Sequence, residues 1–449
     1  MGALERVREL GIAQGGDGHE DVRQRRRELR DRLKRGLVER LGLSEVAALV
    51  GDGASELVRE ELAVACRAVL NEDGFSELDA DERDGLVRQV IDEVVGLGPL
   101  QPLLDDPTIS EVMVNGCASV YYERDGRILP ARMTFDSPEQ VMLVMDRILA
   151  PLGRRLDDAS PIVNARLSNG YRVNAVIAPV AMDGPAVTIR KFSGQIRTLE
   201  SLVELGSLPT WFSRLLSWAV RLRQDIAVAG GTGSGKTTLL NAISLYIPHE
   251  ERIITIEDTP ELRLNQPHVI RMETRDANVE GKGLITYRDL VTNALRQRPD
   301  RIIVGECRDA AAFDMLQAMT TGHDGSLTTI HADNCREVPV RLRTLVQQAN
   351  TGMSSREILE YISQAIDFII YTERSHGVRR VTEIAEVQGM QGDVVTIAPI
   401  VRFEHDPNDP EHSGWFVPTG ERFMRRHIEK MSNEGVYVND DWFNPQAVF

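Results

Sequence analysis

The chain has 449 residues, enough for two or three domains that each bury a hydrophobic core. Its hydrophobic and charged fractions, 42% and 27%, are those of an ordinary soluble globular protein. No apolar run approaches the roughly 18 residues of a membrane span. The formal net charge of −16 argues against a protein that coats nucleic acid, because affinity for a duplex comes mainly from cationic contacts to phosphate.

The amino terminus and the cysteines indicate the compartment. The first residues, MGALERVREL, lack the apolar core of a secretory signal, and Arg6 stands where a myristoylation site needs serine or threonine. The cysteines are widely spaced and form no C-x-x-C pair, which favours reduced thiols; they are Cys66, Cys117, Cys307 and Cys335. We therefore expect a chain that is made and kept in the cytoplasm.

The first part of the chain is predicted to be helical. Residues 1–20 are polar and contain several glycines, and we expect them to be loosely ordered. A helical N-terminal domain follows over residues 21–96, where apolar residues recur every three or four positions. Its first segment, Asp21–Gly42, carries the densest arginine cluster of the chain. This segment either touches anionic lipid or a partner protein, or forms a solvated helix with internal ion pairs.

A smaller α/β domain is predicted over residues 97–193. Strands joined by turns are expected in four stretches: ISEVMVNG, SVYYERDGRIL, PIVNARLSNGYRVNAVIAP and AVTIRKF. One helix, SPEQVMLVMDRILAPLG, interrupts them behind a Ser137 cap and Pro138. Residues 194–209 are expected to serve as a linker.

Residues 210–403 show the alternation of strands and helices that predicts a mostly parallel sheet. The strand candidates are DIAVAG, RIITIE, HVIRM, RIIVGE, SLTTIH and FIIYT. Two alternating strands, RRVTEIAEV and VVTIAPIVRF, follow, and a C-terminal extension over residues 404–449 holds a short helix near GERFMRRHIEKM. The predicted fold class is therefore α/β.

The stretch AGGTGSGKTT, Ala229–Thr238, carries the pattern G-x-x-x-x-G-K-[ST] of a phosphate-binding loop. Glycine permits the backbone angles that point several amides at one polyphosphate, and the predicted helix Thr237–Ile247 turns its N-terminus to the phosphates. Within the loop, Lys236 reaches the β- and γ-phosphates and the Thr237 hydroxyl ligates Mg²⁺. The residues expected to contact the nucleotide are Gly230, Gly231, Thr232, Gly233, Ser234, Gly235, Lys236, Thr237 and Thr238.

Hydrolysis of ATP further requires a carboxylate that orients water and groups that hold Mg²⁺. The stretch RIITIEDTPEL places Glu257 and Asp258 at the end of a strand, and DRIIVGECRD places Glu306 at the end of another. Arg308 and Asp309 follow close behind Glu306. Strand ends on one edge of an open α/β sheet line the ligand crevice, so these acids can meet metal and water together. The alternative is that they only cap a turn or a helix.

Two histidines flank the predicted strand in TTGHDGSLTTIHAD. His323 precedes the strand and His331 ends it. A histidine at a strand edge beside the nucleotide can sense the γ-phosphate by hydrogen bonding. A zinc site would instead use His331, Asp333 and Cys335, but this set lacks a convincing fourth ligand.

Four motifs occur together and in order: GGTGSGKTT, IEDTPEL, RPDRIIVGECRD and MTTGHDGSLTTIHAD. They resemble the Walker A loop, the Asp box, the atypical Walker B motif and the His box of the hexameric secretion ATPases of type II and type IV secretion systems and type IV pili. The upstream stretches ISEVMVNG, NARLSNGYRVNAV and VTIRKF look most like those of the CpaF-type ATPases that assemble tight-adherence (Flp) pili. The resemblance covers roughly Gly96 to Phe403 and implies a RecA-like P-loop NTPase core.

The resemblance implies roles for individual residues. Glu257 corresponds to the glutamate that activates water. Glu306 corresponds to the Walker B glutamate, which binds Mg²⁺ together with Thr237. His323 and His331 correspond to the His box, and all of these residues are expected to act in catalysis.

Two further residues, Arg172 and Arg190, resemble arginines that the N-terminal domain of these ATPases contributes to nucleotide, often across a subunit boundary. A composite site of this kind would be a physical reason for oligomerisation; the alternative is an ordinary surface arginine on a strand. The match to the family is incomplete, since Asp333 stands where asparagine is expected and Asn164 where aspartate is common.

We predict a Mg²⁺-dependent ATPase, a homo-hexameric motor for pilin assembly or protein export. The expected partner is a polytopic platform protein that holds the motor at the cytoplasmic face of the inner membrane. A nucleic-acid translocase is the alternative function, although the acidity and the 5% of aromatic residues disfavour a single-strand groove and no stable nucleic-acid partner is expected. A third possibility, a scaffold that binds nucleotide without turnover, is opposed by the presence of both Glu257 and Glu306.

Overall fold

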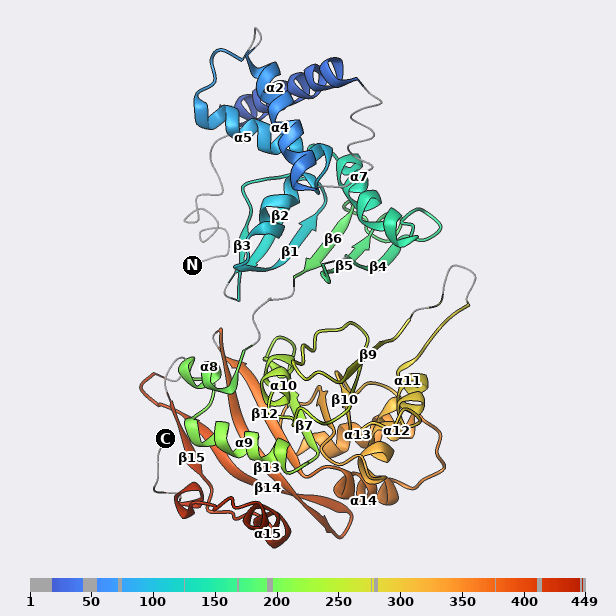
Figure 1. The fold of residues 1–449 in the computed structure, drawn as a ribbon, viewed down its shortest axis with the longest axis vertical. Helices are drawn as coiled ribbons and strands as arrows, with labels where there is room; N and C mark the ends of the chain where they lie inside the picture. Colours follow the sequence, from blue (N-terminus) through green and yellow to red (C-terminus); the bar gives the residue numbers. More distant parts are fainter. Residues whose placement is uncertain are drawn as a thin grey trace. The chain divides into compact units, whose positions relative to one another are not determined.

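The computed structural model describes residues 18–42, 55–71, 75–124, 126–167, 169–191, 197–275, 277, 282–375, 377–409, 414–444 and 446. The chain folds into two compact units, Met1–Phe192 and Ser193–Phe449 (Figure 1). Most of the segment expected to be loosely ordered, residues 1–20, lies outside the described residues, and the first described helix begins at Gly18. No helix in the described ranges is both long and apolar enough to cross a membrane.

Three helices open the first unit: α2 (Gly18–Leu41), α4 (Glu56–Leu70) and α5 (Ala80–Val94). Ser55 accepts from the Val58 amide at the start of α4, and Asp79 forms a capping box with Glu82 at the start of α5. The apolar stripes of the three helices pack against one another in a core that includes Leu33, Leu37, Leu62, Cys66, Val87 and Val90.

The arginine-rich helix α2 is held by ion pairs. Arg30 Nε lies 3.0 Å from Glu93 of α5, and the Arg30 guanidinium also pairs with Asp136 in the α/β part of the unit. Lys34 pairs with Glu93 as well. These pairs join α2 to other elements instead of lying within the helix, and the contact with Asp136 fastens the helices to the neighbouring sheet.

The first unit contains an antiparallel sheet with the strand order β3-β2-β1-β6-β5-β4. Alternate residues such as Val112, Val114 and Ile189 are buried, because successive side chains of a strand point to opposite faces. Helix α7 covers this face. The bounds are β1 (Ile109–Asn115), β2 (Ser119–Arg124), β3 (Arg127–Pro130), β4 (Ile162–Arg166), β5 (Arg172–Val176), β6 (Ala186–Arg190), η1 (Gly98–Leu100), α6 (Gln101–Asp105), α7 (Pro138–Leu149) and η2 (Ala150–Leu152).

The linker prediction for residues 194–209 is wrong over its described part. Thr198 caps helix α8 (Leu199–Glu204) in a capping box with Ser201. Leu199 and Leu208 are buried in the core of the second unit. Thr198 and Ser201 satisfy backbone amides at the start of a short helix, and the leucines pack inward.

The second unit is built on a nine-stranded sheet with the order β15-β14-β13-β12-β7-β11-β10-β8-β9. The six neighbouring strands β12, β7, β11, β10, β8 and β9 run parallel to one another. The strands β13, β14 and β15, on the other side of β12, each pair antiparallel with the preceding one. The bounds are β7 (Ile226–Gly230), β8 (Ile253–Glu257), β9 (Val269–Glu273), β10 (Arg301–Val304), β11 (Leu327–Ile330), β12 (Phe368–Ser375), β13 (Val378–Gln391), β14 (Val394–His405) and β15 (Gly414–Pro418). The prediction of a mostly parallel α/β sheet behind a smaller α/β part and a helical segment is confirmed.

Helices cover both faces of this sheet (Figure 1). Ile226 and Val228 of β7 face one core with α8 and α9, and Ala227 and Ala229 face the other with α11 to α14. Every residue of β7 and β8 is buried, as expected for central strands covered on two sides. The helices are α9 (Thr210–Arg221), α10 (Lys236–Ser244), α11 (Tyr287–Ala294), α12 (Ala311–Thr320), α13 (Glu337–Gln347), α14 (Ser355–Ala365) and α15 (Arg425–Asn433).

The tail predicted as an extension over residues 404–449 is an integral part of this unit where it is described. Strand β15 pairs with β14 and lengthens the sheet. Trp442, in the 3₁₀ segment η3 (Asp440–Phe443), stacks on Trp211 of α9 with 5.7 Å between ring centroids. Because the tail buries aromatic residues against α9, the fold of the second unit includes it.

Candidate nucleotide-binding site

The loop between β7 and α10 has the backbone that a phosphate cradle requires. Gly235 adopts a φ of +101° and Gly233 a φ of +70°, a region that residues with a Cβ atom disfavour. A Cβ atom built on Gly230 would lie 2.3 Å from the Thr372 carbonyl oxygen, so no side chain fits there. The three glycines allow the loop to curl back over the first turn of α10.

Lys236 is the first residue of α10, and Thr237 and Thr238 follow it in the same turn. The Lys236 side chain is buried, and its Nζ donates to Gly230 O at 3.0 Å and to Gly231 O at 2.7 Å. A buried ammonium beside carbonyl groups at a helix N-terminus is ready to exchange these acceptors for phosphate oxygens.

Parallel pairing brings the predicted acids to the edge of the sheet that carries the loop. Strands β7, β8 and β10 run in the same direction, with β11 between β7 and β10. Gly230, Glu257 and Glu306 stand at or just after the ends of these strands. The three motifs, which are far apart in the sequence, therefore meet at one edge of the sheet, where ligand sites of open α/β sheets lie.

Glu257 has one oxygen satisfied and one left open. Its side chain is 2% exposed, and Oε1 accepts from the backbone N–H groups of Glu261 (2.7 Å) and Leu262 (2.9 Å). Oε2 is buried and has no hydrogen-bond partner. Burial raises the pKa of the Glu257 carboxyl from 4.5 to about 7. A fixed carboxyl with a free buried oxygen and a pKa near neutrality is suited to take a proton from water.

Glu306 is held from two sides. Arg308 donates to Glu306 Oε2 at 2.5 Å and to Asp258 Oδ2 at 2.8 Å, so one guanidinium joins the two strand ends. His331 Nε2 lies 3.0 Å from Glu306 Oε1. Burial lowers the pKa of His331, and the positive charge of nearby Lys236 lowers it further. The bridging position of Arg308 was not predicted; its place two residues after the Walker B glutamate was the available signal.

His323 does not reach this site within the chain. It precedes β11, and its carbonyl accepts from Ser326 Oγ at 2.8 Å. The backbone N–H of Ser326 in turn donates to Asp225, the residue before β7. His323 therefore lies at the amino edge of the sheet, opposite the phosphate loop. Within one chain β11 separates the two residues that match the His box, and a catalytic role of His323 stays a prediction.

Arg172 and Arg190 lie in the first unit. They are register partners on the antiparallel strands β5 and β6. Residues directly opposite in such a pair project from the same face, so the two predicted nucleotide contacts form one cationic pair.

The zinc alternative has no support in the structure. Cys335 is buried, with its Sγ 3.7 Å from the carbonyl oxygen of Ile369. Over the described residues, no group of three or more histidine, cysteine or acidic side chains is placed to hold a metal.

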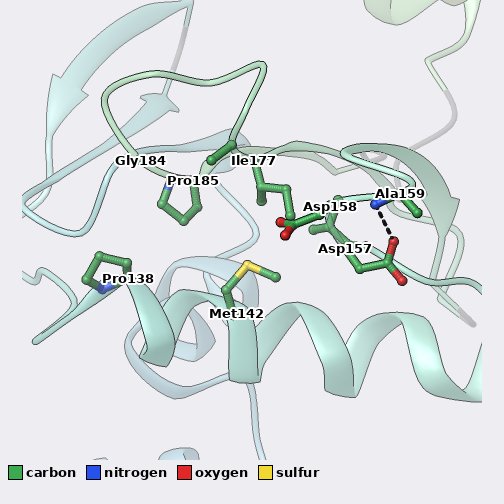
Figure 2. A pocket seen from close by; sticks show the side chains of 10 residues that line it. Pro138, Met142, Asp157, Asp158, Ala159, Ile177, Gly184 and Pro185 are labelled. Carbon is green, nitrogen blue, oxygen red and sulfur yellow. Dashed lines mark hydrogen bonds between the residues drawn. The ribbon is translucent and has the colours of Figure 1, made fainter.

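A pocket in the first unit is separate from the nucleotide site. It has a volume of about 730 Å³ and is lined by apolar residues such as Met142, Ile177 and Pro185 (Figure 2). Asp157 and Asp158 are its charged lining residues, and Asp157 accepts from the backbone N–H of Ala159 at 3.0 Å. A lining with two acids and no cation repels polyphosphate.

Two oxygen-bearing side chains at this edge of the sheet are suited to bind Mg²⁺. The Thr237 hydroxyl and the Glu306 carboxylate are the kinds of ligand that this ion takes alongside nucleotide phosphates. Glu306 is oriented by Arg308 and His331, so its position is fixed before any ion arrives.

A match to the protein family described as "Type II/IV secretion system protein" spans residues 93–382. The chain belongs to this family. The matched segment begins at the end of α5 and extends into β13, so it includes the sheet of the first unit, the phosphate loop and the strand ends that carry Glu257 and Glu306.

Individual relatives of this type II/IV secretion protein agree with that assignment. The putative conjugal transfer protein Rv3659c of Mycobacterium tuberculosis is 36% identical over 312 residues, which cover 68% of this chain and 88% of the relative. The conjugal transfer protein TrbB of Rhizobium radiobacter is 32% identical over 307 residues, covering 68% and 91%. The crystal structure of the VirB11 ATPase from the Brucella suis type IV secretion system is 30% identical, covers 64% of this chain and 95% of its own, and superposes with a TM-score of 0.36.

Proposed function

We propose that this protein is a Mg²⁺-dependent ATPase that drives a secretion or pilus assembly machine. The observation that carries the proposal is Glu257, whose buried Oε2 lacks a partner at the edge of the sheet that bears the phosphate loop. Family membership supports the same activity. The chain binds ATP through residues 230–238 and hydrolyses it to ADP and phosphate.

In this proposal each group has a separate task. Lys236 leaves the carbonyl oxygens of Gly230 and Gly231 and binds the β- and γ-phosphates. Glu257 Oε2 accepts a proton as the water oxygen attacks the γ-phosphorus, and the bond from that phosphorus to the ADP oxygen breaks. Thr237 and Glu306 would hold Mg²⁺, which neutralises charge on the phosphates when bound.

His331 and Arg308 act through Glu306. His331 Nε2 and the Arg308 guanidinium contact different oxygens of this carboxylate. Both are therefore positioned to respond when nucleotide changes the charge around Glu306, and we assign them to its orientation.

Phosphate release by the purified full-length chain tests the activity. The Lys236→Ala variant should lose nucleotide binding and turnover. Lys430→Ala is the matched control, because Lys430 lies on α15 and its Nζ contacts Arg223 O at 3.4 Å, at the amino edge of the sheet. Equal turnover by wild type and Lys236→Ala would refute the assignment of the loop. DNA is added in a parallel assay, and strong stimulation by DNA would favour a nucleic-acid translocase.

We further propose that the active form is a homo-hexamer in which Arg172 and Arg190 contact the nucleotide of a neighbouring subunit. Their location in a different unit from the phosphate loop supports this arrangement. Arg190→Ala and Lys236→Ala rings should each be inactive alone, whereas mixed rings should recover part of the activity. A monomer that is fully active at high ATP would refute the composite site.

The finer assignment is to the CpaF-type branch that assembles tight-adherence (Flp) pili. The motor would lie in the cytoplasm and attach to a polytopic platform protein of the inner membrane. Fractionation with and without the platform protein separates this contact from binding to lipid, because attraction to an anionic surface fades with salt and a packed protein contact does not. Membrane association without the platform protein would contradict it.

A further inference from the structure

The phosphate loop is flanked by a hairpin that lies outside the sequence motifs. Strand β12 lies beside β7 with Thr372 opposite Gly230, then runs past the end of β7 into a hairpin with β13 (Figure 1). Thr372 Oγ1 lies 2.9 Å from Ser234 Oγ and donates to Ala229 O at 3.2 Å. These contacts fasten the base of the hairpin to the loop.

Two arginines near the tip of this hairpin reach the loop. Arg374 and Arg379 are direct cross-strand partners, so their side chains leave the same face of the ribbon. Arg379 Nε donates to Gly233 O at 2.9 Å. A Cβ atom built on Gly233 would lie 3.4 Å from a guanidinium nitrogen of Arg374. Both guanidinium groups thus lie against the turn whose amides are to meet the phosphates.

We propose that Arg374 and Arg379 are positioning residues for the nucleotide. The carbonyl and the N–H of one trans peptide point in opposite directions. By holding Gly233 O, Arg379 directs the N–H of Ser234 inward, where it donates to Gly231 O at 3.4 Å. Lys236 Nζ donates to the same oxygen at 2.7 Å. Two donors therefore converge on one acceptor, and a phosphate oxygen of bound nucleotide takes its place.

Charge gives the pair a second task. Both guanidinium groups lie beside the loop that is to hold the phosphates. Their attraction for a polyphosphate grows with its negative charge, so the arrangement favours ligands with more negative charge. This inference rests on the nucleotide site of the proposed function, but it concerns how tightly and how selectively that site holds its ligand.

The first test concerns Arg379. Arg379→Ala should raise KM for ATP about tenfold, the loss expected for one hydrogen bond made by a charged group. The kcat value should change little, because the water-activating group is untouched. Arg379→Lys, which keeps a charged donor, should recover part of the affinity. The matched control is Arg380→Ala. Arg380 lies opposite Glu373 in the register of the hairpin, and its guanidinium carbon is 4.9 Å from the centroid of the Phe403 ring.

The second test concerns Arg374 and uses binding of fluorescent ATP and ADP analogues to the full chain. Arg374→Ala should weaken the binding of ATP by a larger factor than the binding of ADP, because ATP carries the greater negative charge. Added salt should shrink the difference between Arg374→Ala and wild type. A group that only stabilised the fold would weaken both nucleotides equally and independently of salt.

Three results would overturn the proposal: an Arg379→Ala variant that behaves like Arg380→Ala, equal losses of ATP and ADP in Arg374→Ala, or no recovery in Arg379→Lys. Thermal unfolding without nucleotide checks that every variant is folded. A wild-type chain that binds ATP but does not turn it over would refute the proposed ATPase activity, and the binding measurements would still decide the role of the arginines.

Discussion

The two edges of the nine-stranded sheet treat buried charge in opposite ways. At the amino edge, His427 lies between two carboxyls: its Nε2 is 3.1 Å from Asp367 Oδ1, and its Nδ1 contacts Glu386, which is fully buried. At the carboxyl edge, Glu257 is equally well buried, but Oε2 meets no partner. The same depth of burial thus produces a satisfied network at one edge and an open acceptor at the other.

This difference separates structural charge from functional charge. Burial alone would lower the pKa of His427, but its hydrogen bonds to Asp367 and Glu386 raise it above the ordinary value, so each ring nitrogen has a carboxyl partner. Burial raises the pKa of Glu257, and the hydrogen bonds from the Glu261 and Leu262 amides and the charge of Arg271 offset this rise only in part. A network with all its partners fixes the position of α15 against the sheet, whereas an acid without one is adapted to an incoming ligand.

The largest expected effect comes from neutralising the open acid. Glu257→Gln should reduce turnover roughly 10²–10⁴-fold while ATP still binds, because an amide cannot take a proton from water. Glu273→Gln is the matched control: Glu273 is the register partner of Glu257 on the parallel strand β9 and is exposed. Single-turnover phosphate release measures the effect. Normal turnover by Glu257→Gln would show that another group activates water.

The next effect comes from breaking the satisfied network. His427→Ala removes a cationic partner of the fully buried Glu386, whereas the half-buried Asp367 keeps its contact with Arg426, and the loss should cost about 3 kcal/mol of unfolding free energy. Denaturant unfolding measures it, with the exposed His249→Ala as control. Turnover per folded molecule should stay close to that of wild type, because His427 lies at the edge opposite the phosphate loop. A stable His427→Ala variant would mean that α15 is held by its apolar contacts alone.

The pH dependence of turnover sharpens the comparison further. A general base acts only when ionised, so kcat/KM should rise with pH up to the pKa of Glu257, about 7, and level off above it. Below that value it should fall about tenfold per pH unit. The residual rate of Glu257→Gln should lack this limb. A limb that survives in the variant would belong to another group, with His331 the first candidate.

Much of this site could be predicted from the sequence, because the parallel order of the strands brings its residues to one edge of the sheet. Once the strands ending at Gly230, Glu257 and Glu306 are placed in one parallel sheet, their ends must share an edge. The same reasoning separates His323 from His331. Only the resemblance to the His box groups these two residues, and a strand that lies between two residues places them at opposite edges, as β11 does here.

The contacts made by side chains from remote elements could not be predicted. Arg379 is 146 positions away from Gly233 in the chain, and only the pairing of β12 with β7 brings them together. The bridge from Arg308 to Asp258 likewise depends on the order of strands in the sheet, with β10 next to β8. Local sequence patterns predict helices, strands and turns, whereas contacts between side chains of different strands depend on the register of the strands in the sheet.

The smallest expected effect is a gain of stability when Glu257, at the carboxyl edge of the sheet, is replaced by glutamine. The pKa of Glu257 in the folded chain, about 7, lies above its ordinary value of 4.5. The folded state therefore holds a proton that the unfolded chain releases, so stability falls as pH rises from 4.5 to 7 and the full cost is present above that range. One pKa unit corresponds to about 1.4 kcal/mol. At high pH the free energy of unfolding of Glu257→Gln should exceed that of wild type by on the order of 2 kcal/mol, after allowance for the cost of the buried amide that replaces the acid.

Denaturant unfolding of wild type and Glu257→Gln across pH 5.5–8.5 measures this gain as a difference that widens with pH. Glu273→Gln again serves as control and should show no such trend, because Glu273 is exposed. His427 also ties stability to pH, since a group with a raised pKa loses its contribution as pH rises through that value. This contribution is the same in wild type and in Glu257→Gln, so the comparison cancels it. A constant difference between the two proteins at all pH values would show that Glu257 is ionised in the folded state throughout, and that its second oxygen has a partner after all.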